Sequence, residues 1–104
     1  MSTISIGGAE RPLAVADAGW IGRAFDAHKQ AGELPCVRVM IRGGNVDLTL
    51  QTLNCAAATG RGGRPPSSDE AEISRLWNME GLGSMRFAAD QVAVFVERVR
   101  HLLR

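Results

Sequence analysis

Apolar and polar side chains alternate along residues 36–53, and the alternation is interrupted at Gly43-Gly44-Asn45. Alternation of this kind is typical of strands that bury one face. A two-residue turn would place the apolar side chains of both strands on the same face, whereas a three-residue turn would place them on opposite faces. The pattern therefore predicts a β-hairpin over 36–53 with a two-residue turn, in which Arg42 faces Asp47 as a cross-strand ion pair.

Apolar residues recur at helical spacing in three other segments. The first helix is expected to begin after Asp17, a good N-cap residue, and to end at Gly32. The second begins with the capping-box sequence Ser67–Glu70 and ends at Gly81. The third runs from about Asp90 to the end of the chain and carries a broad apolar stripe. The stripe consists of Val92, Phe95, Val96, Val99, Leu102 and Leu103.

A short strand at Thr3–Ile6 precedes the first helix, and residues 82–87 are a further candidate strand. With that strand the order is βαββαβα, which is ferredoxin-like with an added helix. Without it the order is βαββαα, and the sheet has at most three strands, with helices on the apolar face of the hairpin. A chain of 104 residues has room for one domain, so we predict a single α+β domain over 1–104.

Residues 54–66 form a predicted loop that contains the sequence GRGGR. A loop of this length is unusual in a small domain and is typical of functional or mobile segments. Glycines allow backbone N–H groups to approach a phosphate, and arginines supply positive charge. The loop is therefore either a mobile connector or a binding loop, in which Arg61 and Arg64, with Arg38 and Arg42 of the hairpin, bind a small anionic ligand or nucleic acid.

Composition and charge narrow the class of protein. The chain is 45% hydrophobic and 22% charged, which excludes a disordered or collagen-like chain. Twelve basic and eleven acidic side chains give a formal net charge of +1. Nucleic-acid-binding domains usually carry a basic excess, which the whole chain lacks. Nucleic-acid binding would therefore depend on the local arginines rather than on the overall charge.

His28 is the candidate for acid–base chemistry, because imidazole titrates near neutrality and the residue lies on the apolar side of the first helix. A hydrogen-bonded histidine of the core is the alternative interpretation. A pair with Glu80, or activation of a Cys36 thiol by His28, would make a small enzyme if these elements adjoin. The sequence holds no complete catalytic set, so we predict no catalytic residue and no cofactor.

Cys36 and Cys55 are too few for a disulfide framework. Together with the two histidines they lack the spacing of a zinc site, so no metal site is predicted. We expect buried free thiols, as in a cytoplasmic protein. The N-terminus lacks the basic and apolar regions of a signal peptide, and the longest apolar run, 92–96, is far shorter than a membrane span. We therefore predict a cytoplasmic protein without membrane contact.

Apolar side chains also occur at positions that are expected to face solvent. Met40 and Leu53 lie on the polar face of the hairpin, and Val94 lies opposite the apolar stripe of the last helix. The edge strands of a hairpin present unpaired backbone N–H and C=O groups, and pairing with a second copy of the chain would satisfy them. Two-fold dimers are the commonest oligomers. These features predict a homodimer.

The stretch GRGGRPPSSDEAEISRLW (60–77), followed by Glu80-Gly81-Leu82 and Phe87, resembles small uncharacterised bacterial proteins of the kind carried on mobile gene cassettes. The resemblance covers about a third of the chain. It implies a bacterial source and an accessory role, and it assigns no catalytic residue. We therefore predict a non-enzymatic, self-associating binding or accessory protein. Anionic-ligand or nucleic-acid binding through the Gly60–Arg64 loop and a small enzyme using His28 are the alternatives.

Overall fold

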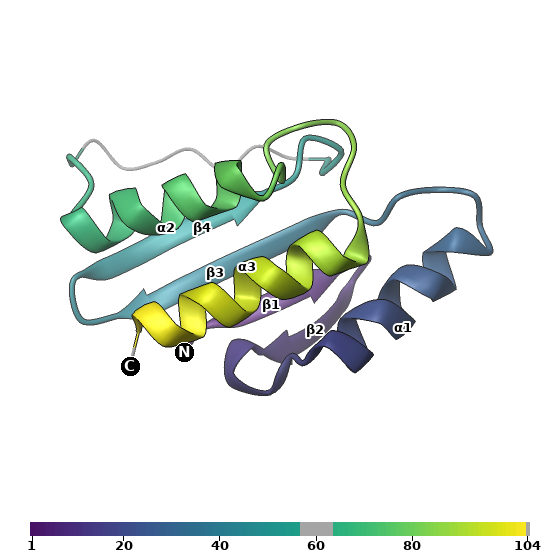
Figure 1. The fold of residues 1–104 in the computed structure, drawn as a ribbon, viewed down its shortest axis with the longest axis horizontal. Helices are drawn as coiled ribbons and strands as arrows, with labels where there is room; N and C mark the ends of the chain where they lie inside the picture. The colour runs from purple at the N-terminus through teal and green to yellow at the C-terminus, as the bar shows by residue number, and fades with distance from the viewer. Residues whose placement is uncertain (57–63, 104) are drawn as a thin grey trace.

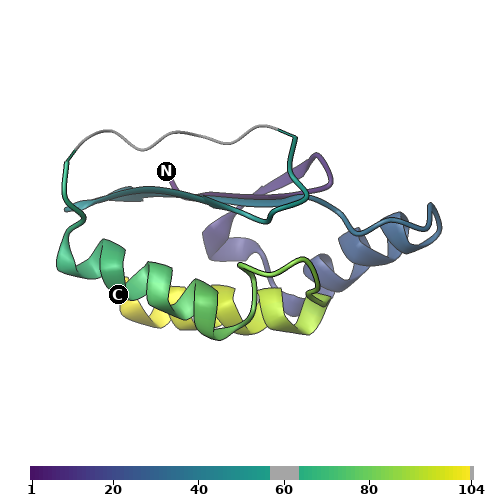
Figure 2. The same ribbon diagram turned by 90° about the horizontal axis from the view of Figure 1, so that it is seen from above.

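The structure, a computed structural model, describes residues 1–56 and 64–103. They form a four-stranded antiparallel sheet with three α-helices packed on one of its faces, and the other face carries no helix (Figure 1, Figure 2). The elements are β1 (Thr3–Ile6), β2 (Ala9–Pro12), the 3₁₀ turn η1 (Leu13–Val15), α1 (Ala18–Lys29), β3 (Val37–Gly43), β4 (Val46–Gln51), α2 (Ser68–Met79) and α3 (Ala89–Leu102). The predicted α+β class is confirmed.

The β3–β4 hairpin has the predicted register. Arg42 pairs with Asp47 and Ile41 with Leu48, so the turn consists of Gly44 and Asn45. Gly44 has a φ of 58°, a left-handed conformation that glycine adopts without strain. A positive φ at the first turn residue alone is the pattern of a type II′ turn, which matches the twist of the two strands.

A second N-terminal strand, β2, was not expected from the sequence. It pairs antiparallel with β1 and forms one edge of the sheet, whose order is β2-β1-β3-β4. The strand Ala9–Pro12 has no buried residue, so it lacks the alternation by which strands are recognised. Gly7 and Gly8, with φ values of 58° and 92°, form the turn that returns the chain along β1.

Residues 82–87 form a turn and irregular chain rather than a strand, so the ferredoxin-like alternative does not apply. The fourth strand comes from β2 at the other end of the chain. Leu82 and Phe87 are nevertheless buried, and the Phe87 ring meets the Phe25 ring edge-on at 6.0 Å. The apolar residues of this segment therefore close the end of the core between α2 and α3.

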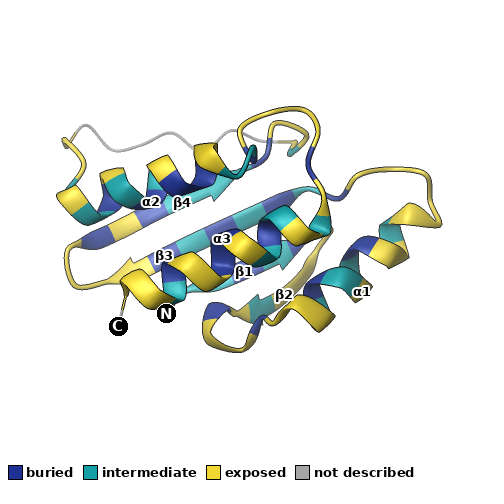
Figure 3. Cartoon of the chain, in the orientation of Figure 1, coloured by how far each residue is buried: buried dark blue, intermediate teal, exposed yellow. Residues whose placement is uncertain are grey.

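The core lies between the sheet and the helices. Buried and less buried positions alternate along β3 and at the start of β4 (Figure 3). In the helical layer α3 contacts both α1 and α2, and its Phe95 meets Trp77 of α2 edge-to-face at 5.2 Å. The sheet contributes Ile4, Ile6, Val37, Val39, Ile41, Val46 and Leu48 to the core, and α3 contributes Val92, Phe95, Val96 and Val99. No helix in the described part of the chain is long and apolar enough to cross a membrane.

The two cysteines form a disulfide, so the prediction of free thiols is wrong. Cys36 precedes β3, and Cys55 follows β4, with their Cα atoms 4.9 Å apart. Thr52 extends the hairpin by donating its N–H to the Val37 carbonyl at 3.0 Å, and the Cys55 N–H then bonds back to the Thr52 carbonyl at 3.2 Å. The hairpin register and this turn bring the sulfurs together, which a count of cysteines does not reveal.

Candidate functional site

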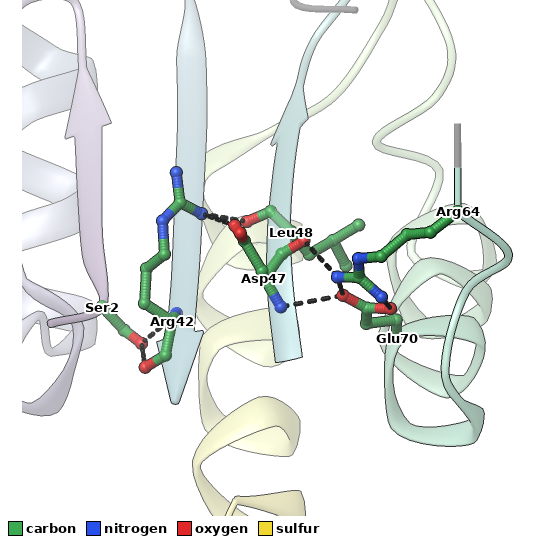
Figure 4. A network of polar contacts seen from close by, with 6 residues as sticks. All are labelled: Ser2, Arg42, Asp47, Leu48, Arg64 and Glu70. Atoms are coloured by element: carbon green, nitrogen blue, oxygen red, sulfur yellow. Dashed lines mark hydrogen bonds and ion pairs between the residues drawn. The ribbon is translucent and has the colours of Figure 1, made fainter. Parts of the chain in front are cut away.

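Two of the predicted arginines, Arg42 and Arg64, lie on either side of Asp47 at the edge of the sheet formed by β4 (Figure 4). Arg42 comes from β3, and Arg64 comes from the segment just before α2. Glu70, on the first turn of α2, completes the cluster. The fold therefore joins residues that are separated by more than twenty positions in the chain.

The Glu70 carboxylate is the centre of this cluster, and its side chain is only 1% exposed. Arg64 donates to both of its oxygens, at 2.9 and 2.5 Å, and the N–H groups of Ser67 and Asp47 donate to it at 2.8 Å each. The Arg64 guanidinium and then these two N–H groups lower the pKa of Glu70 to about 2. Glu70 is therefore ionised and fully paired at neutral pH.

The capping box explains how the sequence places Glu70. The Ser67 hydroxyl accepts from the Glu70 N–H at 3.2 Å, and the Glu70 carboxylate accepts from the Ser67 N–H in return. The same carboxylate binds the outward N–H of Asp47, while Arg64 donates to the Asp47 carbonyl at 3.3 Å. Side chains thus occupy the N–H and carbonyl groups of Asp47, which an edge strand otherwise presents to another chain.

Arg42 is held on the outer face of the hairpin. Its guanidinium forms the predicted ion pair with Asp47 at 2.8 Å and donates to the Leu48 carbonyl at 3.4 Å. Its backbone N–H donates to the Ser2 hydroxyl at 3.1 Å, which ties the N-terminus to the hairpin. The predicted cross-strand pair is confirmed.

Every predicted ligand-binding arginine in the described part of the chain has a partner within the protein. Arg38 donates from Nε to the Gln51 side chain at 3.1 Å, and Arg42 and Arg64 pair with carboxylates. Arg61 lies outside the described residues. The cluster of Arg42, Asp47, Arg64 and Glu70 carries no net charge, so an anion would compete with the carboxylates that already pair with both guanidinium groups.

His28 lies apart from the arginines. Its imidazole covers Gly7, so closely that a Cβ at Gly7 would lie 2.0 Å from the ring. Glu80 lies near Arg98 of α3, with 3.7 Å between Oε2 and Nε. Cys36 is held in the disulfide and has no thiol to activate. The geometry gives His28 a packing role at the β1–β2 turn.

A groove on the outer side of the helical layer is the second candidate site. Of its lining residues, the sequence pattern indicated only Val94 as an exposed apolar side chain and Asp17 as an N-cap. It lies between the start of α1 and the middle of α3 and has a volume of about 430 Å³. Val94 is 40% exposed at its margin. The lining residues are Ala16, Asp17, Ala18, Ala93, Val94, Glu97, Arg98 and Arg100. Three alanines and a valine make the groove apolar, with charges around it.

Arg100 fixes one wall of this groove. It donates to the carbonyls of Leu13 and Ala16 at 3.1 and 2.5 Å, so it joins α3 to the η1 turn. Asp17 caps α1 by accepting the Trp20 N–H at 2.8 Å, and this hydrogen bond lowers the pKa of Asp17. The groove is therefore formed before any partner binds.

Among the residues that the structure describes, no group of three or more histidine, cysteine or acidic side chains is arranged to hold a metal ion. No family model, no curated protein and no solved structure matches the chain.

Proposed function

We propose that the protein is a non-enzymatic accessory protein that acts as a homodimer, assembled through the outer surface of its helical layer. The observation that carries this proposal is the preformed apolar groove beside the exposed side chain of Val94. Small side chains such as Ala18 and Ala93 allow another helix to approach closely. Because a two-fold dimer uses the same surface on both subunits, one such groove per chain suffices.

The test is the native mass across a range of concentrations, measured by sedimentation. We expect the mass to rise from 11.1 kDa toward twice that value, and Val94→Arg to keep the protein monomeric. Leu53→Arg is the matched control, because Leu53 is also exposed but lies beyond the hairpin, away from the groove. A wild-type protein that stays monomeric at every concentration overturns the proposal.

Binding of an anionic ligand or nucleic acid is the second candidate. It is supported by the face of the sheet that carries no helix, which includes Arg38 and Arg42 (Figure 2). It ranks lower because both arginines already have partners in the hairpin. Binding to a single-stranded oligonucleotide at low salt, lost on replacing both arginines by alanine and weakened by salt, would support it. No binding at low salt would exclude it.

The disulfide is relevant to the cellular compartment in which the protein functions. Disulfides persist in oxidising compartments and are rare in the cytoplasm, so Cys36–Cys55 favours an oxidising compartment over the cytoplasmic location expected from the sequence. Alkylation of free thiols in freshly lysed cells would distinguish the two, because only an unpaired cysteine takes up the reagent. The bacterial source and the mobile-cassette role implied by the resemblance stay predictions.

A further inference from the structure

The exposed side of α3 carries opposite charges at equal distances on either side of Val94. Asp90 lies four residues before Val94, and Arg98 lies four residues after it. Residues spaced by four lie on the same side of a helix, so the acid, the valine and the base form one exposed row. All three are exposed, and the opposite side of α3 is buried in the core.

We infer that two copies of the chain pack α3 against α3 in antiparallel orientation, with the two-fold axis at Val94. The inference rests on the proposed self-association and names the surface and its pairing. In an antiparallel pair centred on Val94, Asp90 of each chain faces Arg98 of the second copy. The row of charges is therefore complementary to itself in this orientation, and two ion pairs form by symmetry.

Asp90 has no cationic partner among the described residues, and Arg98 is half-exposed and forms one long ion pair there. Among residues 1–56 and 64–103 no cation pairs with Asp90, whose carboxylate accepts only the Gln91 N–H at 3.0 Å. Arg98 pairs with Glu80 at 3.7 Å between Nε and Oε2, and in the dimer it would share its guanidinium between Glu80 and Asp90 of the second copy. The neighbouring acid Glu97 is already within 3.3 Å of Arg100 and of His101. Glu97 therefore does not compete for Arg98.

The shape of the surface suits the same arrangement. The groove lies directly beside the row, and its alanines leave room for the Val94 side chain of the second copy. A specific dimer buries about 800 Å² on each partner. The molecule measures 40 by 27 Å across its two longer axes, and the view along its shortest axis shows α3 in the middle of this broad face (Figure 1). The face is therefore large enough for a stable interface centred on α3.

The experiment is a charge reversal followed by mixing. Asp90→Arg gives a chain with cations at both positions 90 and 98, and Arg98→Asp gives a chain with carboxylates at both. We expect each variant alone to dimerise about tenfold more weakly or worse, because two like-charge contacts form by symmetry. An equimolar mixture should form a heterodimer with wild-type affinity or better. Isotope labelling of one variant identifies the heterodimer by native mass spectrometry.

If mixing the two variants restores dimerisation, the loss in each variant alone came from the contact between two chains and not from a change within one chain. Positions 90 and 98 are about 12 Å apart along one helix, so they do not pair with each other inside a subunit. Asp26→Arg and Lys29→Asp on α1 are the matched controls, since both residues are exposed and lie off α3. Near-ultraviolet circular dichroism of the two tryptophans verifies that each variant is folded.

The outcomes are distinct. A wild-type monomer overturns both the proposed function and this inference. A wild-type dimer whose mass is unchanged by Asp90→Arg and by Arg98→Asp keeps the self-association but overturns the α3 interface. Weaker dimerisation of both variants without heterodimer formation on mixing overturns the antiparallel pairing. Heterodimer formation, with no effect of the α1 controls, supports it.

Discussion

Glu70 illustrates how one residue serves both a helix and a sheet. A buried carboxylate is unfavourable unless its oxygens are hydrogen-bonded and its charge is paired. Here Arg64 neutralises the charge, and two backbone N–H groups from different elements complete the hydrogen bonding. The same contacts cap α2 and join it to the edge of β4. Arg64 therefore acts as part of the fold, although its sequence context also suggests a ligand-binding role.

The pKa of Glu70 leads to a prediction for stability against pH. Its pKa is about 2 in the folded chain and 4.5 ordinarily, so its stabilising contribution is complete above pH 4.5 and is lost as the pH falls through about 2. We expect Glu70→Gln to lower the free energy of unfolding in urea at pH 7. The difference in the free energy of unfolding between wild type and Glu70→Gln should become smaller as the pH falls from 4.5 to 2.

The matched control for this prediction is Glu33→Gln, which changes an exposed carboxylate in the connection after α1. It should have little effect at any pH. A difference between Glu70→Gln and wild type that stays constant from pH 7 to pH 2 would show that the loss comes from packing rather than from the ionised carboxylate.

At the scale of elements, the β1–β2 turn depends on contact with α1. Gly7 and Gly8 both have positive φ values, which permit the tight return of the chain. Gly7 also lies under the His28 ring, whereas the space around Gly8 is open. The Gly7 N–H donates to the Cys36 carbonyl at 2.9 Å, so the turn also continues the pairing of β1 with the chain before β3. His28 therefore acts where a turn, a strand and a helix meet.

This arrangement predicts different effects for two neighbouring substitutions. Gly7→Ala should lower the free energy of unfolding by about 2 kcal/mol or more, because it combines an unfavourable φ with a collision with His28. Gly8→Ala should lower the free energy of unfolding by less than Gly7→Ala does, since at Gly8 only the φ is unfavourable. Adding His28→Ala to Gly7→Ala should recover part of the loss in urea unfolding. Equal effects of the two alanine substitutions would contradict the packing role of His28.

At the scale of the whole molecule, the described helices cover only one face of the sheet, and a covalent bond closes the β3–β4 hairpin. The helices lie on one side of the sheet (Figure 2), and the buried side chains of β1, β3 and β4 point to that side. The opposite side carries polar residues such as Arg42, Asp47 and Thr49. The disulfide joins the two ends of the hairpin at a separation of 19 residues. It restricts the unfolded chain more than it adds contacts to the folded one.

Reduction is therefore expected to lower stability without opening the hairpin. Thr52 still accepts the Val37 N–H at 3.0 Å through its hydroxyl, and Asn54 still holds the Leu34 and Pro35 carbonyls. Dithiothreitol should lower the free energy of unfolding by about 2–4 kcal/mol and leave the far-ultraviolet circular dichroism unchanged. The Cys36→Ser, Cys55→Ser double variant is the control, because the reductant should have no effect on it.

The sequence alone determined the parts of the structure that follow from local rules. The β3–β4 register follows from the two-residue period of the apolar side chains, and a shift by one residue would expose that apolar face. The start of α2 follows from the Ser67 capping box, and that of α1 from the Asp17 N-cap. These features depend on neighbours within a few residues, or on one alternating pattern, so the chain itself contains enough information to place them.

The tertiary structure decided what depends on distant residues. Strand β2 forms because its backbone pairs with β1, although none of its own four residues is buried. The disulfide forms because the hairpin returns Cys55 to Cys36. Arg64 and Glu70 meet over the backbone of β4, so residues with the chemistry of a binding site become structural. Composition and spacing show which groups are present, but only packing determines which partner satisfies each of them.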